Sequence, residues 1–246
     1  MDRDTVYFVS DAHFGLDADE AAKTAKFAEL AAEMRGRATD VFFVGDMFDF
    51  WIEYRSVIRR DYFTVLHIMR GLVEAGVRVH YVGGNHDFAL GTFLEETAGV
   101  AVHRGCADAE LQGRRAHISH GDKVCKGSLL RIADKLLRNG PLQALYRAIH
   151  PDIGIWGGGR VSAASKRKYR GVEIPQKTLN RYRRAAEALM AGGARDLVIF
   201  AHTHRADLVN FAGGDYCNTG SWLDRYDYAI LRGGKIQLLR WGYSAS

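Results

Sequence analysis

Seven side chains with oxygen or nitrogen donors stand in five short motifs along the chain, and they are the residues most able to do chemistry. They are Asp11, His13, Asp46, Asn85, His120, His202 and His204. Seven donors exceed the usual complement of a site for one metal ion. If the Asp46 carboxylate is shared, they can serve two ions roughly 3.5–4 Å apart, which is the two-metal arrangement for displacement at phosphorus.

The spacing and chemical types of these donors define the kind of site expected. In the Asp-x-His motif at 11–13 and the His-x-His motif at 202–204, an extended backbone would point both donors to the same side. Each pair can therefore hold one metal ion or straddle two. Gly45 and Gly84 precede donors and let the chain turn sharply close to an ion. Imidazole, carboxylate and carboxamide groups without a thiolate favour Mn, Fe, Ni or Zn over Mg or Cu(I).

A single motif of this kind is weak evidence, because lone Asp-x-His and His-x-His sequences are common. The Gly-Asn-His-Asp sequence at 84–87 could likewise be a turn with Asn at positive φ. All five motifs in order, each closing an apolar run, are hard to obtain by chance. Other polar residues are expected to have no part in the chemistry: Asp87 and Asp122 brace loops, His67 and His80 serve packing, and His103, His117 and His150 have no role at the site.

Short apolar runs precede the motifs and predict the strands that position them: Val6 to Val9, Val41 to Val44, Val77 to Val82, Ala116 to Ser119, and Leu197 to Ala201. Between the first three runs, Ala21 to Met34 and Tyr62 to Glu74 show helical patterns. Alternating strands and helices predict an α/β core with parallel strands. Ligands gather outside the carboxyl ends of such strands, so five strand ends bearing Asp, Asn or His predict one cluster.

The C-terminal part has a different pattern, with short runs joined in pairs by the Gly-Gly turns at 213–214 and 233–234. The runs are Ala206 to Phe211, Asp215 to Asn218, Tyr228 to Arg232, and Ile236 to Trp241. This pattern predicts an antiparallel hairpin series. The core is therefore expected to be a mixed sheet or two sheets packed together.

The segment from Lys123 to Arg184 is strongly basic, with 15 Lys and Arg residues against three acidic ones, whereas the rest of the chain is acidic overall. Helical patterns recur around it, at Ser128 to Arg138, Leu142 to Ile149, Ser162 to Tyr169, and Thr178 to Ala191. We interpret residues 124–175 as a helical cap inserted within a single domain of residues 1–246.

Three roles for this cap are open. Its charges could simply aid solubility, or the cap could cover an anionic substrate with an apolar part or dock on an anionic bilayer surface. Nucleic acid is the least favoured partner, because few aromatic residues stand among the basic ones.

The composition is that of an ordinary soluble globular protein, with 47% hydrophobic and 26% charged residues. The sequence shows no signal peptide and no run of 18 apolar residues. Three scattered cysteines fit neither a disulfide framework nor a Cys-rich zinc site. The expected location is the cytoplasm.

In their order and over most of the chain, the five motifs resemble the signature of the calcineurin-like metallophosphoesterases. The resemblance implies hydrolysis of phosphate esters by a β-sandwich flanked by helices, in α/β/β/α layers. It implies two divalent ions, with Mn²⁺ expected and Fe, Zn or Ni as alternatives. One ion would be held by Asp11, His13, Asp46 and His204, and the other by Asp46, Asn85, His120 and His202.

The resemblance also implies a catalytic pair. His86 would lie next to the scissile phosphate, and Asp49 would orient it. A histidine in this place can stabilise developing charge or protonate the leaving oxygen, and a carboxylate partner would fix its tautomer.

Within this family the chain is similar to the branch that hydrolyses UDP-2,3-diacylglucosamine in lipid A synthesis. The matching residues are Gly45 to Ile52, the His120-Gly121-Asp122 loop before the helical insert, and Asn218 to Trp222. The resemblance implies cleavage of the pyrophosphate to UMP and an acylated sugar 1-phosphate, at the cytoplasmic face of the inner membrane. From the cap, Ser162, Ser165 and Lys166 would contact the substrate.

One position departs from this branch, whose best-known members have Arg where this chain has His86. The departure leaves the lipid substrate open, but not the hydrolysis. The alternative enzyme is a phosphodiesterase or phosphatase acting on a soluble nucleotide or another phosphoester. A non-catalytic scaffold on the same fold is a minor alternative, since a scaffold should have lost ligands that this chain keeps.

Overall fold

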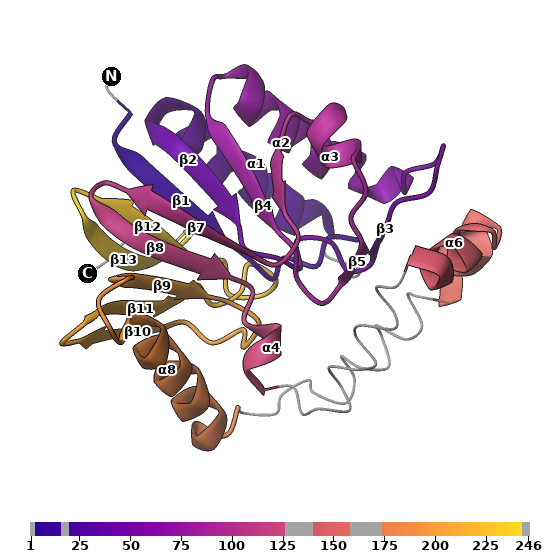
Figure 1. The fold of residues 1–246 in the computed structure, drawn as a ribbon. Helices are drawn as coiled ribbons and strands as arrows, with labels where there is room; N and C mark the ends of the chain where they lie inside the picture. The colour runs from indigo at the N-terminus through magenta and orange to yellow at the C-terminus, as the bar shows by residue number, and fades with distance from the viewer. Residues whose placement is uncertain (1–2, 16–19, 126–139, 158–173, 243–246) are drawn as a thin grey trace.

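The computed structural model describes residues 3–15, 20–125, 140–157 and 174–242. Two large sheets pack face to face, and helices cover the outer face of each sheet (Figure 1). The α/β/β/α layering expected from the resemblance is therefore confirmed.

The first sheet contains six strands: β1 (Thr5–Val9), β2 (Ala38–Phe43), β4 (Arg78–Val82), β6 (Ala101–His103), β12 (Asp227–Arg232) and β13 (Lys235–Arg240). Their order is β13-β12-β1-β2-β4-β6. The four strands from β1 to β6 are parallel, as the strand–helix alternation predicts, and β12 and β13 add an antiparallel edge.

The second sheet contains five strands: β7 (Cys106–Leu111), β8 (Arg114–Ser119), β9 (Leu197–Phe200), β10 (Asp207–Phe211) and β11 (Gly214–Asn218). Their order is β10-β11-β9-β8-β7, with β8, β9 and β11 parallel. A separate parallel pair, β3 (Trp51–Ile52) and β5 (Asp87–Ala89), lies beyond the first sheet.

The C-terminal hairpins form as the Gly-Gly turns indicate, but they do not make one continuous series. The β10–β11 hairpin belongs to the second sheet, and the β12–β13 hairpin belongs to the first. The chain crosses from one sheet to the other between them. Of the two arrangements left open by the sequence, the structure has two packed sheets.

The helices are α1 (Glu20–Arg37), α2 (Phe63–Glu74), α3 (Phe93–Glu96), α4 (Asp122–Cys125), α6 (Gly140–Arg147) and α8 (Gln176–Met190), with a short 3₁₀ turn η1 (Arg60–Tyr62). The apolar faces of α1 and α2 pack on the first sheet, where Phe27, Met34 and Leu72 are buried. The face of α8 that carries Tyr182 and Met190 packs on the second sheet. Each is an amphipathic helix whose apolar stripe covers a sheet.

Between the sheets lies a continuous apolar layer that includes Phe8, Phe42, Ile118, Ile199 and Leu231. Strands β1 and β9 are buried along their whole length, as expected for parallel strands covered on both faces. Close packing of this kind resists deformation, so the strand ends that carry the candidate site are held on a rigid support.

Residues 140–157 of the cap lie apart from both sheets, beside β3 and β5 (Figure 1). The α6 side chains of Gln143 and Arg147 donate to the carbonyl oxygens of Phe88 and Glu53, both at 2.8 Å. Residues 151–157 form a further helical segment. The expected helices at 128–138 and 162–169 fall outside the described residues, and the extent of the cap, 124–175, stays a prediction.

Candidate metal centre

The seven donors follow the carboxyl ends of five parallel strands. Asp11 and His13 follow β1, Asp46 follows β2, and Asn85 follows β4 of the first sheet. From the second sheet, His120 follows β8, and His202 and His204 follow β9. The candidate centre therefore lies at the rim of the sandwich and takes side chains from both sheets.

One set of donors gathers around Asp11. The nitrogen and oxygen atoms that Asp11, His13 and His204 can offer to a metal lie within 4.8 Å of one another. The His204 Nε2 atom is 3.2 Å from Asp11 Oδ1 and 3.4 Å from His13 Nε2.

A second set gathers around His120. Its Nε2 atom is 3.2 Å from Asp46 Oδ2, 3.2 Å from Asn85 Oδ1 and 3.1 Å from His202 Nδ1. Asp46 also lies within 4.8 Å of a ligand atom of His13. Asp46 is thus placed between the two sets, as the shared carboxylate of a two-metal site would be.

The hydrogen bonding of His120 supports a cation at this place. Its Nδ1 atom lies 2.8 Å from the Val44 carbonyl oxygen, to which it can only donate. In the neutral ring Nε2 therefore carries a lone pair, which faces a carboxylate oxygen, a carboxamide oxygen and another imidazole nitrogen. Electron-pair donors that converge in this way are stabilised by a cation, either a proton or a metal ion, so the residues present fit a metal centre.

The electrostatics of the metal-free centre lead to the same conclusion. Burial favours the neutral form of His120, but the carboxylates of Asp46 and Asp11 outweigh it and raise the pKa of His120 to about 10. Burial and the neighbouring His120 lower the pKa of His202 to about 4. The His120 ring is therefore protonated on both nitrogens, and the His202 ring beside it stays neutral. Metal binding must displace the proton from His120, because only the neutral ring can be a ligand.

The backbone at the centre is strained. Five donors have positive φ angles: Asp11 (50°), His13 (45°), Asp46 (53°), His202 (68°) and His204 (53°). The left-handed region costs a residue with a Cβ atom roughly 1–3 kcal/mol. The expectation of extended Asp-x-His and His-x-His segments was therefore wrong, because left-handed residues follow the strand ends.

The two donor motifs are arranged differently around the centre. Asp11 and His13 belong to the same set, whereas His202 and His204 belong to different sets, so the His-x-His motif straddles the centre.

Backbone hydrogen bonds fix the first two donor loops to each other. The Asp11 amide donates to Gly45 O at 3.1 Å, and the His13 amide donates to Asp46 O at 3.0 Å. Gly84 must be glycine here, because a Cβ atom would lie 2.2 Å from Asp46 Oδ1. The loops are packed too closely for the donors to move independently.

His86 lies beside this cluster, with its ring edge-on to His13 at a centroid distance of 4.6 Å. Its Nδ1 atom donates to the backbone carbonyl of Asp49, and the Asp49 carboxylate is farther away, at 3.9 Å. The residue expected to orient His86 therefore contacts it mainly through the main chain. This bond leaves Nε2 of His86 facing away from Asp49.

Several supporting residues were not identified from the sequence. Ser10 donates to Asp11 Oδ2 at 2.7 Å, Ser221 donates to the Asp11 carbonyl at 3.0 Å, and Asn218 donates to the Ala201 carbonyl at 2.8 Å. Lys23 of α1 reaches the first donor loop. A signal for Lys23 existed, since it precedes Phe27 by four residues on the apolar face of a helix. Asn218 and Ser221 stand in the Asn218 to Trp222 segment that carries the family resemblance, but the sequence did not show their contacts with the donor loops.

Other residues discussed from the sequence lie elsewhere or support loops. Asp87 accepts from the amides of Gly84 and Asp46 at 2.7 and 3.2 Å. His80 and His117 pair with Asp40 and Asp108, away from the donors. Ser162, Ser165 and Lys166 fall outside the described residues, so their role as substrate contacts stays a prediction.

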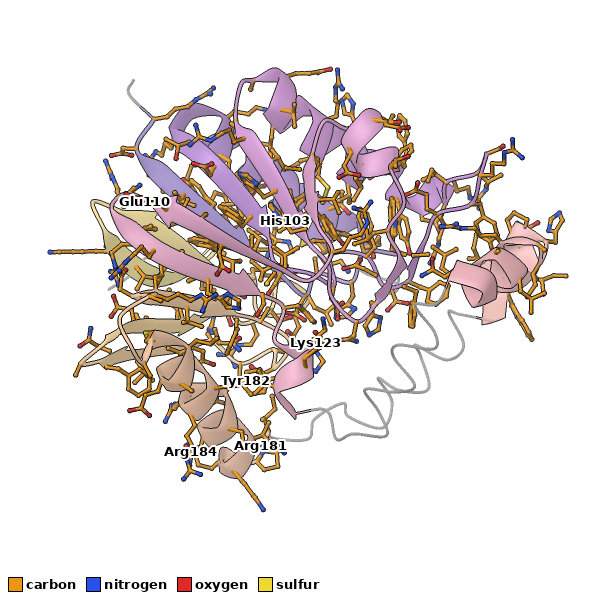
Figure 2. All side chains as sticks on the ribbon, in the orientation of Figure 1. His103, Glu110, Lys123, Arg181, Tyr182 and Arg184 are labelled. Carbon is orange, nitrogen blue, oxygen red and sulfur yellow. The ribbon has the colours of Figure 1, made fainter. Side chains whose placement is uncertain are left out.

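Tyr182 connects α8 to the His120 loop. It lies on α8, which packs beside α4 (Figure 2). A Cβ atom on Gly121, the residue after His120, would lie 2.9 Å from the Tyr182 ring. The outer helix thus packs directly behind one of the donors.

Comparisons with known proteins agree with this geometry. A UDP-2,3-diacylglucosamine hydrolase of Porphyromonas gingivalis is 33% identical, with 96% of this chain and 97% of the relative covered. A protein of the same name from Neisseria meningitidis is 28% identical, with 92% of each covered. The model of the calcineurin-like phosphoesterases matches residues 5–206, from the first strand past the His-x-His motif. The chain therefore belongs to the calcineurin-like phosphoesterase family and, with potential metal ligands gathered from both sheets, is a metal-dependent hydrolase of phosphate esters.

Proposed function

We propose that the chain hydrolyses the pyrophosphate bond of UDP-2,3-diacylglucosamine and releases UMP and the acylated sugar 1-phosphate. The observation that carries the reaction type is the meeting of two donor sets at Asp46. The substrate is supported by relatives of that name, which match the chain along nearly their whole length.

The candidate centre assigns a task to each group. Asp11, His13 and His204 would hold one Mn²⁺ ion, Asn85, His120 and His202 would hold the other, and Asp46 would contact both. Two such ions, when bound, supply an activated water and offset the negative charge of the substrate. Imidazole and carboxylate donors without thiolate suit Mn²⁺ among the ions considered.

His86 would act on the phosphate itself. Its side chain is 19% exposed, whereas the Asp46 and His120 side chains are almost fully buried, so it can reach a substrate above the metal ions. Because Nδ1 donates to Asp49 O, Nε2 is the atom left for the substrate, and in the imidazolium form it can donate to a phosphate oxygen or to the leaving group.

The direct test measures UMP release from UDP-2,3-diacylglucosamine in detergent, with purified protein and Mn²⁺. We expect turnover, complete loss of turnover after chelation, and recovery when Mn²⁺ is restored. The deacylated UDP-sugar and bis(p-nitrophenyl) phosphate serve as comparison substrates. Good turnover of the aryl diester together with no turnover of the acylated UDP-sugar would contradict the lipid substrate. It would favour the alternative, a phosphodiesterase that acts on a soluble substrate.

We also propose that the cap attaches the protein to the cytoplasmic face of the inner membrane. Leu145, Ile149, Ile153 and Trp156 recur every three or four residues, and three of the four side chains are more than 60% exposed. The segment from Lys123 to Arg184 is rich in Lys and Arg, which suits an anionic lipid surface. The attachment we propose is peripheral. Among the described residues, no helix is long and apolar enough to cross a bilayer.

Substitution of both Ile153 and Trp156 by serine is expected to weaken binding to phosphatidylglycerol vesicles by about tenfold or more, since burial of even one such apolar side chain contributes about 1.5–3 kcal/mol. Co-sedimentation measures the effect, with phosphatidylcholine vesicles for comparison. Leu208→Ser is the control, because Leu208 is an exposed leucine on β10, outside the cap. Equal vesicle binding by the double variant and the control would show that Ile153 and Trp156 do not contact the membrane.

A further inference from the structure

Lys23 is a lysine of α1 whose side chain is buried, with 3% exposure. Its Nζ atom donates to the carbonyl oxygens of Ala12 at 2.8 Å and of His13 at 3.2 Å. Both carbonyls belong to the first donor loop. One ammonium group therefore binds two successive peptide groups of the segment that presents Asp11 and His13.

The charge of Lys23 is compensated locally. The Glu20 carboxylate, one turn earlier on α1, lies 3.3 Å from Nζ, and the Phe14 ring centroid lies 5.0 Å from it. A buried charge is costly unless it is paired and hydrogen-bonded. An apolar residue in this position would avoid that cost, but it could not donate to the two carbonyl oxygens.

The loop that Lys23 contacts requires external support. Asp11 and His13 both have positive φ angles, which their own side chains disfavour. The preceding carbonyl, that of Asp11, accepts from the Ser221 hydroxyl at 3.0 Å and the Leu223 amide at 3.1 Å. Lys23 continues this support over the next two carbonyls, from helix α1.

We propose that Lys23 is a positioning residue for the metal centre, which holds the Asp11–His13 loop in the conformation that binds metal. The inference rests on the proposed function, because it presumes that these donors bind metal ions. The groups that orient metal ligands typically contribute about ten- to a hundredfold to metal affinity. We expect a loss of that size when the two hydrogen bonds from Lys23 are removed.

The test compares three variants. Lys23→Met keeps the length of the side chain and removes its donors, but leaves the buried carboxylate oxygens of Glu20 without their cation. The double variant Lys23→Met with Glu20→Gln removes both charges, which separates the loss of the hydrogen bonds from a simple charge imbalance. Lys26→Met is the matched control, because Lys26 lies one turn further along α1 and contacts the Tyr226 ring instead.

Two readouts are needed. Thermal unfolding of the metal-free proteins reports on the fold, and calorimetric titration with Mn²⁺ reports on metal affinity without any turnover. The double variant is expected to unfold near the wild-type midpoint and to bind Mn²⁺ about ten- to a hundredfold more weakly. Lys26→Met should match the wild type in both measurements.

Wild-type affinity in the double variant would overturn the positioning role. The positioning role would also be overturned if the weaker Mn²⁺ binding of the double variant were fully explained by a smaller fraction of folded protein. Lys23 would then serve only the fold. Failure of the wild-type protein to bind Mn²⁺ is a different result, and it would remove the proposed function itself.

Discussion

Replacing Asp46 with asparagine is expected to lower turnover by more than about a hundredfold and to weaken Mn²⁺ binding by at least as much. Groups that only orient metal ligands contribute about ten- to a hundredfold, and Asp46 is placed to be a ligand of both ions. Asparagine keeps the shape of the side chain and removes the charge that lies 3.2 Å from His120 Nε2.

The rise in unfolding temperature on addition of Mn²⁺ measures this effect apart from turnover. A ligand stabilises the folded state in proportion to the logarithm of its concentration over its dissociation constant, so a hundredfold weaker site loses about 2.7 kcal/mol of this stabilisation. Each protein is compared with its own metal-free form. Asp61→Asn, at an exposed carboxylate on η1, is the control. An unchanged Mn²⁺ response in Asp46→Asn would show that the two donor sets do not share this carboxylate.

Replacing His86 with glutamine is expected to give a different result, a fall in kcat of about a hundredfold or more with Mn²⁺ affinity retained. Proton transfer by a positioned side chain contributes about 10²–10⁴-fold to rates. The His86 backbone amide, which donates to Asp46 Oδ1 at 2.8 Å, remains in the variant, so Asp46 keeps its support.

The measurement pairs kcat with a calorimetric Mn²⁺ titration. His67→Gln is the control, since His67 is exposed on α2 and stacks on Phe63. His86 has a ring nitrogen within 4.8 Å of ligand atoms of His13 and Asp46. If His86→Gln loses metal and turnover together, His86 is a ligand and not the group that acts on the phosphate.

The location of the donors could be predicted from the sequence because of the parallel strands. Apolar runs such as Val6 to Val9 show where each strand ends, and parallel strands bring their carboxyl ends to one edge. The conformation of the donor segments could not be predicted in the same way. Side-chain alternation assumes extended backbone, whereas Asp11 and His13 are left-handed and are held there by Ser221 and Lys23, which are distant in sequence or on another element.

The role of Asp49 shows a second limit. A carboxylate near a histidine suggests a side-chain contact, but the hydrogen bond from His86 is accepted by the backbone carbonyl of Asp49. Main-chain contacts of this kind cannot be predicted from residue identity, because every residue type has a carbonyl group. The same holds for the hairpins, whose turns are visible in the sequence although the sheet that each joins is not.

The position of β1 between β2 and β12 has a consequence for biosynthesis. Strand β1 leaves the ribosome before both of its neighbours: it pairs on one side with β2, which is made soon afterwards, but its other side must wait for residues 227–232. Until then the nascent chain exposes an unpaired strand edge, which invites association with other chains. We therefore expect ribosome-bound intermediates of this protein to depend on chaperones until residues 227–232 have left the ribosome.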